Sequence, residues 1–177
     1  MNGIRYNVLF LCTGNSARSV LAESILNHLG KGRFRAFSAG SHPAGRVQPL
    51  ALEWLARQNF PVDGLRSKSW DEFGAPGSPP MDFVFTVCDK AAGELCPVWP
   101  GQPMTAHSGI PDPAAAQGGE REARQAMGDA LRQLSRRISL FVSIPLDKLD
   151  AMTLKREIRA IGALDDGGAA STTAPLS

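Results

Sequence analysis

The sequence has no long apolar run, and this absence excludes a membrane-spanning helix. Although 43% of its 177 residues are hydrophobic, no stretch approaches the ~18 consecutive apolar residues that cross a bilayer. The opening residues, Met1–Tyr6, lead into a short apolar run that lacks the length and the small-residue cleavage site of a secretory signal peptide. We therefore expect a cytoplasmic protein with no membrane partner.

The sequence also has little net charge and few cysteines. Its formal net charge of +2 is too small to indicate a nucleic-acid partner. Its three cysteines, Cys12, Cys88 and Cys96, are not expected to form a structural disulfide framework in a reducing compartment. The spacing of Cys88 and Cys96 and the absence of a nearby histidine pair do not fit zinc. We expect free or redox-active thiols, with no metal and no cofactor.

Strand-like and helix-like patterns alternate along the chain. Strands are predicted at 6–11, 33–39, 82–87 and 104–107, and helices at 19–29, 48–58, 67–73, 118–144 and 147–161. This alternation predicts an α/β fold, an open four-stranded parallel sheet flanked by helices. Ligands of such sheets bind beyond the carboxyl ends of the strands. We expect one domain over residues 1–162 and, from its Asp, Gly, Ala, Ser and Thr content, a disordered tail over 163–177.

The segment Cys12–Ser19 joins the first predicted strand to the first predicted helix. Successive backbone N–H groups in such a turn form a concave anion site, and the helix N-terminus adds positive charge. Arg18 can bind a tetrahedral oxyanion through two parallel hydrogen bonds, and the same field is expected to lower the pKa of Cys12. Cys12 is therefore the predicted nucleophile. The predicted oxyanion-binding residues are Thr13, Gly14, Asn15, Ser16, Ala17 and Arg18.

Other polar residues accompany this loop. Ser16 and Ser19 are expected to donate hydrogen bonds to the sulfur or to the loop, and Asn15 is expected to tolerate a left-handed backbone conformation. Asp112 precedes Pro113 in a later loop, where it is either a general acid for a leaving oxygen or an ordinary turn residue. The alternative for Cys12 is a buried structural cysteine.

These features together resemble the low-molecular-weight tyrosine phosphatase fold, and more closely the arsenate reductases that share it. The segments that carry the likeness are Leu9–Ser19, Ala22–Glu23, Ser38–Gly40 and the Asp-Pro pair. The resemblance extends from about Asn7 to Ile161. It implies that Cys12 is the nucleophile, that Arg18 binds the oxyanion and that Asp112 is the general acid.

The cysteine pair favours the reductase over the phosphatase. A phosphatase needs one thiolate, whereas a reductase must supply two electrons by disulfide exchange. Phosphatases of this fold usually carry an aromatic residue after Asp-Pro, where this chain has Ala114, and its single tyrosine is Tyr6. The alternative for the pair is that Cys88 is a buried residue at a strand end and Cys96 is incidental.

The resemblance implies a three-cysteine relay. Cys12 attacks arsenate, Cys88 then attacks Cys12 to release arsenite, and Cys96 receives the disulfide from Cys88. Thioredoxin, or glutaredoxin with glutathione, restores the thiols. The competing functions are a protein tyrosine phosphatase that forms a Cys12 phosphoenzyme and a non-catalytic anion-binding module.

Some relatives bind potassium beside the loop through Asn, Glu, Ser and Asp residues. Asn15, Glu23 and Ser38 match the first three, but the region of the fourth reads Ser67-Lys68-Ser69. Because a lysine there would replace a bound cation, no potassium site is predicted.

Overall fold

The computed structural model describes residues 5–88, 99, 101–113 and 116–164. Its four strands are β1 (Tyr6–Cys12), β2 (Phe34–Gly40), β3 (Phe83–Thr86) and β4 (Met104–His107). They form one sheet in the order β2-β1-β3-β4, and every pairing is parallel. The predicted fold class is confirmed, with each strand within one residue or so of its expected bounds.

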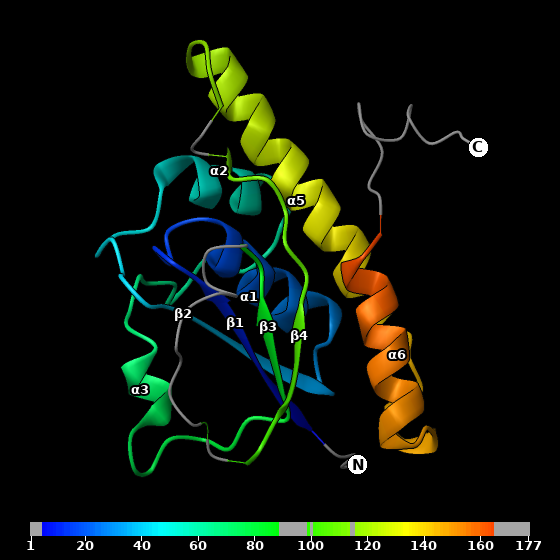
Figure 1. The fold of residues 1–177 in the computed structure, drawn as a ribbon. Coiled ribbons are helices and arrows are strands. Elements are labelled where there is room, and N and C mark those ends of the chain that lie inside the picture. Colours follow the sequence, from blue (N-terminus) through cyan, green and yellow to red (C-terminus); the bar gives the residue numbers. More distant parts are fainter. Residues whose placement is uncertain (1–4, 89–98, 100, 114–115, 165–177) are drawn as a thin grey trace, which may run out of the picture.

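Helices and loops cover the two faces of the sheet (Figure 1). The helices are α1 (Arg18–Leu29), α2 (Pro49–Arg57), α3 (Asp71–Gly74), α5 (Glu120–Val142) and α6 (Ala151–Gly162), with a 3-10 turn, η2, at Leu146–Lys148. On β1, Val8 and Phe10 face the core formed with α1 and α5, while Leu9 and Leu11 face the smaller core beside α3. Because successive strand residues point to opposite faces, one buried run serves both cores.

Two predicted helices begin four residues later in the structure, whereas the other three differ from their expected bounds by no more than two residues. Helix 67–73 is reduced to α3, because the Lys68 N–H donates to the Asn15 side chain and the Lys68 carbonyl accepts from the Gly40 N–H, which leaves no backbone group there for a helical turn. Helix 147–161 begins only at Ala151, because the Asp150 carboxylate accepts the Thr153 N–H at 2.7 Å and caps the helix at that point.

The carboxyl ends of the parallel strands meet at one edge of the sheet. β1 ends at Cys12, and the Val87 N–H donates to the Leu11 carbonyl at 2.9 Å, so that pairing continues past β3 and brings Cys88 to the same edge. At the other end of the chain, Ala163 and Leu164 continue the hydrogen bonding of α6, whereas 165–177 of the expected tail lie outside the described residues. Within the described ranges, no helix has the length and apolar character needed to span a bilayer.

Candidate active site

The loop between β1 and α1 turns its carbonyl groups outward. The carbonyls of Thr13, Gly14 and Ser16 accept hydrogen bonds, each of 2.9 Å, from the N–H groups of residues 42, 44 and 48. In a trans peptide the next N–H points opposite to its carbonyl, so the N–H groups of Gly14, Asn15 and Ala17 point into the concave side of the loop. The N-terminus of α1 opens on the same side, and N–H groups arranged in this way at a helix N-terminus are suited to binding an anion.

Asn15 holds the β1–α1 loop in its conformation through its own backbone angle and the hydrogen bonds of its buried side chain. Its backbone φ of 47° is left-handed, as expected for an asparagine in this position. Its buried amide donates to the hydroxyls of Ser19 at 2.8 Å and Ser38 at 3.0 Å, and its carbonyl oxygen accepts the Lys68 N–H at 2.8 Å. Ser19 therefore supports the loop through Asn15.

A buried ion pair lies behind Asn15. The Lys68 Nζ is 3.8 Å from Glu23 Oε1, and the two side chains are 7% and 14% exposed. Ser38 donates to the same carboxylate oxygen at 2.6 Å. Burial raises the pKa of Glu23, against the opposing charge of Lys68, and burial lowers the pKa of Lys68, against the charge of Glu23. The lysine ammonium thus lies beside Glu23 and Ser38, two of the residues matched above to a potassium site.

The two described cysteines lie together, both buried and reduced. The Thr13 hydroxyl is 3.6 Å from the Cys88 sulfur. The hydrogen bond with Cys88 and burial raise the pKa of Cys12 far above that of a free thiol, although the charge of Arg18 and the Gly14 N–H lower it. This direction is opposite to the lowered pKa that the sequence pattern predicts, because the pattern shows the positive field of the loop but not the neighbouring thiol.

Arg18 connects the loop to the segment that carries Asp112. Its Nη1 donates to the Ile110 carbonyl at 3.1 Å, and its Nη2 is 3.7 Å from Asp112 Oδ2. Arg18 is mostly covered, whereas Asp112 is 46% exposed. Both charges border the same cleft, so a ligand in the loop would contact the guanidinium with the carboxyl group close by.

The cleft has a volume of about 530 Å³. It is lined by Cys12, Thr13, Gly14, Ser16, Ala17, Arg18, Gln48, Cys88, Ile110, Pro111 and Asp112. None of these described lining residues is aromatic, so the cleft offers no ring against which a phenyl group would stack.

The structure thus brings five of the six predicted catalytic residues to one site: Cys12, Arg18, Ser19, Asp112 and Cys88. The sixth, Cys96, lies outside the described residues, as does Ala114. Sequence reasoning missed Gln48 and Ile110, which carry no chemical signature. It also missed Gly40, where a Cβ would lie 2.5 Å from the Thr13 carbonyl oxygen; its place at a predicted strand end was the available signal.

Comparisons with known proteins agree with this architecture. The family model described as "Low molecular weight phosphotyrosine protein phosphatase" matches residues 7–142. An arsenate reductase of Shouchella clausii is 31% identical over 134 residues, which are 76% of this chain and 93% of that protein. The structure of an arsenate reductase from Archaeoglobus fulgidus matches at 27% identity with a TM-score of 0.55, over 74% of this chain and 98% of that one. A low molecular weight protein tyrosine phosphatase from T. tengcongensis has the same fold, at 24% identity and a TM-score of 0.59, over 75% of this chain and 95% of that one.

Proposed function

The chain belongs to the low molecular weight phosphotyrosine protein phosphatase family, and within that family we propose that it reduces arsenate to arsenite. The observation that carries the proposal is the second thiol, because Cys88 is buried and lines the same cleft as Cys12. The Shouchella clausii and Archaeoglobus fulgidus proteins named as arsenate reductases support this choice. A hydrolytic phosphatase has no use for a thiol at that position.

The first step is nucleophilic attack on bound arsenate. The loop N–H groups and the Arg18 guanidinium hold the oxyanion, and the Cys12 sulfur forms a bond to arsenic. Asp112 donates a proton to the departing oxygen, which leaves as water. Ser19 supports the loop through its hydrogen bond with Asn15.

The second step moves two electrons to arsenic. The Cys88 sulfur attacks the Cys12 sulfur, an S–S bond forms, the S–As bond breaks, and its electron pair reduces arsenic(V) to arsenic(III). Arsenite leaves, and Cys96 then attacks Cys88 to form a Cys88–Cys96 disulfide and release the Cys12 thiolate.

The cycle closes when an external dithiol reduces that disulfide. Thioredoxin, or glutaredoxin with glutathione, provides the required chemistry, and each is maintained in the reducing cytoplasm. We accordingly place the protein in that compartment.

A coupled assay tests the proposal. The purified protein is mixed with arsenate, NADPH, and either thioredoxin with its reductase or glutaredoxin with glutathione and glutathione reductase. We expect arsenate-dependent NADPH oxidation with one donor system. Cys12→Ser and Cys88→Ser should abolish it, and Cys96→Ser should limit the enzyme to about one turnover.

The phosphatase alternative predicts the opposite pattern. It requires steady hydrolysis of p-nitrophenyl phosphate that survives Cys88→Ser and Cys96→Ser, with no arsenate-dependent oxidation of NADPH by either donor system. Undiminished multiple turnover of arsenate by Cys96→Ser would refute the proposed relay while leaving the reductase activity in place.

A further inference from the structure

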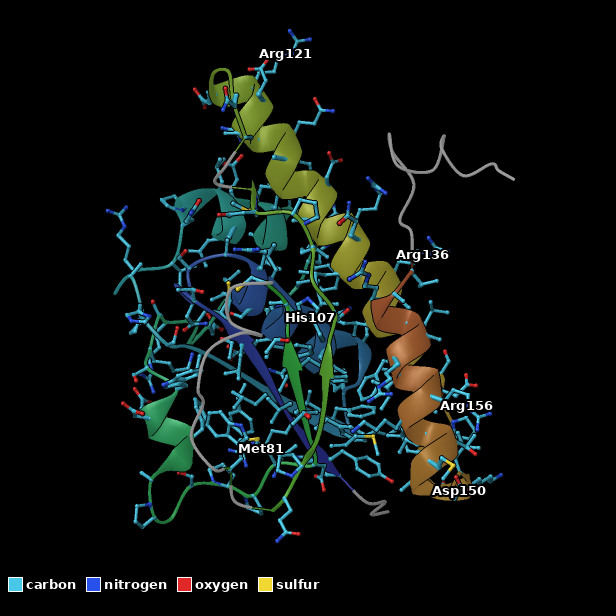
Figure 2. The ribbon with its side chains drawn as sticks, in the orientation of Figure 1. Met81, His107, Arg121, Arg136, Asp150 and Arg156 are labelled. Carbon is cyan, nitrogen blue, oxygen red and sulfur yellow. The ribbon has the colours of Figure 1, made fainter. Side chains whose placement is uncertain are left out.

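The C-terminal helix lies outside the residues that the family model matches, and its last residue lies against the start of the segment that carries Asp112. The family model ends at residue 142, and α6 begins at Ala151. Helix α6 packs along β4 and against α5. Figure 2 labels His107 at the end of β4 and Arg136 near the place where α5 and α6 adjoin. From this end of β4 the chain continues directly into the segment that carries Asp112.

The last residue of α6 touches that segment through its backbone. A Cβ on Gly162 would lie 2.2 Å from the His107 carbonyl oxygen and 3.4 Å from Ser108 Cα. No side chain fits between the two backbones, so this glycine permits the end of α6 to sit directly on the start of the loop.

A buried guanidinium joins the same two segments. Arg137 on α5 is 6% exposed. Its Nη1 donates to the Ser108 hydroxyl at 3.1 Å and to the Gly109 carbonyl at 3.0 Å, and its Nη2 donates to the Leu164 carbonyl, just beyond α6, at 3.1 Å. Burying a cation is costly unless such acceptors surround it, and here the acceptors belong to the loop and to the end of α6.

The segment that Arg137 and α6 hold, residues 108–112, also makes hydrogen bonds at the active site. The Ile110 N–H donates to the Val87 carbonyl at 3.2 Å, and the Ile110 carbonyl accepts from Arg18. Asp112 follows two residues later, 3.7 Å from Arg18. Arg137 and the end of α6 thus hold the 108–112 segment on the side away from the cleft, and Arg18 holds it on the cleft side.

We propose that Arg137 and the end of α6 are positioning elements that set the Asp112 carboxyl group over the oxyanion loop. The catalytic consequence rests on the proposed arsenate reduction, whereas the restraint on the loop does not. General acid catalysis contributes about 10²- to 10⁴-fold, and small displacements of a reacting group forfeit much of such a gain.

The test compares Arg137→Met with Arg137→Lys and with the control Arg136→Met, an exposed neighbour on the same helix. We expect Arg137→Met to lower kcat for arsenate reduction about tenfold with KM for arsenate within about twofold of wild type. Arg137→Lys should retain an intermediate kcat, and Arg136→Met should match wild type. In an Asp112→Asn background, Arg137→Met should cause no further loss, because it acts through Asp112.

A merely structural Arg137 would give the same tenfold loss with or without Asp112, and that result would overturn the proposal. Should Arg137→Met not fold, Ser108→Ala removes one acceptor while keeping the guanidinium, and a smaller kcat loss that again disappears in Asp112→Asn is expected. An unchanged kcat in Ser108→Ala would then count against the proposal.

Amide exchange separates this inference from the proposed function. Arg137→Met, or Ser108→Ala in its place, should accelerate exchange of the Ile110 N–H, whatever the reaction catalysed. Faster exchange in a protein that does not reduce arsenate would refute the proposed function and support the restraint. Active wild-type enzyme with unchanged exchange and unchanged kcat in the variants would refute the restraint alone.

Discussion

Replacement of Cys88 by alanine should make Cys12 a stronger nucleophile at neutral pH. In the structure, the hydrogen bond with Cys88 is the largest cause that raises the pKa of Cys12, and burial is the next. Alanine removes that hydrogen bond, whereas the lowering contributions from Arg18 and the Gly14 N–H remain. The pKa of Cys12 should therefore fall, and the fraction of thiolate at pH 7 should rise.

The size of the effect follows from two opposing changes. Below the pKa of a thiol, each unit by which the pKa falls gives about ten times more thiolate. The thiolate is also less nucleophilic by about threefold for each such unit. The net gain in alkylation rate is therefore about threefold for every tenfold gain in thiolate, and we expect at least that much for Cys88→Ala.

The assay is the pH dependence of alkylation by iodoacetamide, followed at the Cys12 peptide by mass spectrometry. Both proteins carry Cys96→Ser, so that this third thiol neither reacts nor exchanges. The expected result is a faster reaction of Cys88→Ala at pH 7 and a rate profile displaced to lower pH. Ser139→Ala likewise removes one heavy atom, and Ser139 is an exposed residue of α5 that does not line the cleft, so this control should leave the profile where it is.

Coincident profiles for the Cys88→Ala protein and its parent would refute the reasoning, because they would show that Cys88 does not affect the pKa of Cys12. A profile displaced to higher pH would refute it as well. Coincident profiles would leave the positive field of the loop as the control on Cys12, whereas a profile displaced to higher pH would mean that Cys88 lowers the pKa of Cys12.

Three further changes probe the rest of the site. Asp112→Asn should lower kcat for arsenate about 10²-fold with little change in the binding of phosphate by calorimetry; a kcat within about twofold of wild type would exclude it as the general acid. Lys68→Met should reduce the free energy of unfolding in urea by about 3 kcal/mol, because it leaves the Glu23 carboxylate buried and unpaired. Burial already raises the pKa of Glu23 in the folded state, so the folded variant binds the proton more tightly than the unfolded chain, and its stability should fall as pH rises above the ordinary glutamate value; a deficit independent of pH would contradict this. Gly40→Ala places a methyl group 2.5 Å from the Thr13 carbonyl oxygen, so the affinity for phosphate should fall about tenfold, and unchanged binding would show that the loop is not held by this contact.

Much of the fold could be predicted because its signals are local. The apolar run of β1, the small residues of the loop and the helical spacing of α1 lie next to one another in the sequence, so the sequence alone predicts the strand, the turn and the helix. Parallel pairing then required the strand ends to meet at one edge. Cys12 and Cys88 each follow the last residue of a predicted strand, so the sequence predicts that the two thiols lie at the same edge.

The features that escaped prediction depend on contacts between distant segments. Lys68 was expected in a short helix, but its backbone is paired with Asn15 and Gly40, which no local pattern reveals. Arg137 lies next to the apolar stripe of α5, where a cation is normally expected to reach solvent; instead it is buried on the Gly109 carbonyl and the end of α6. Local periodicity identifies a helix face but not the acceptors that meet it.

The position of Cys88 is disadvantageous for a hydrolytic enzyme and useful for a reductase. Cys88 raises the pKa of Cys12, which lowers the fraction of the thiolate on which phosphate ester cleavage depends. In a thiol relay the same closeness is required, because Cys88 must reach the Cys12 sulfur once that sulfur is bonded to arsenic. Cys88 can form a disulfide with Cys12 only after the S–As bond exists, because only then does the Cys12 sulfur carry a leaving group. The neighbouring thiol that raises the pKa of the resting nucleophile is therefore the one that the second sulfur step needs, which is a requirement of arsenate reduction and not of hydrolysis.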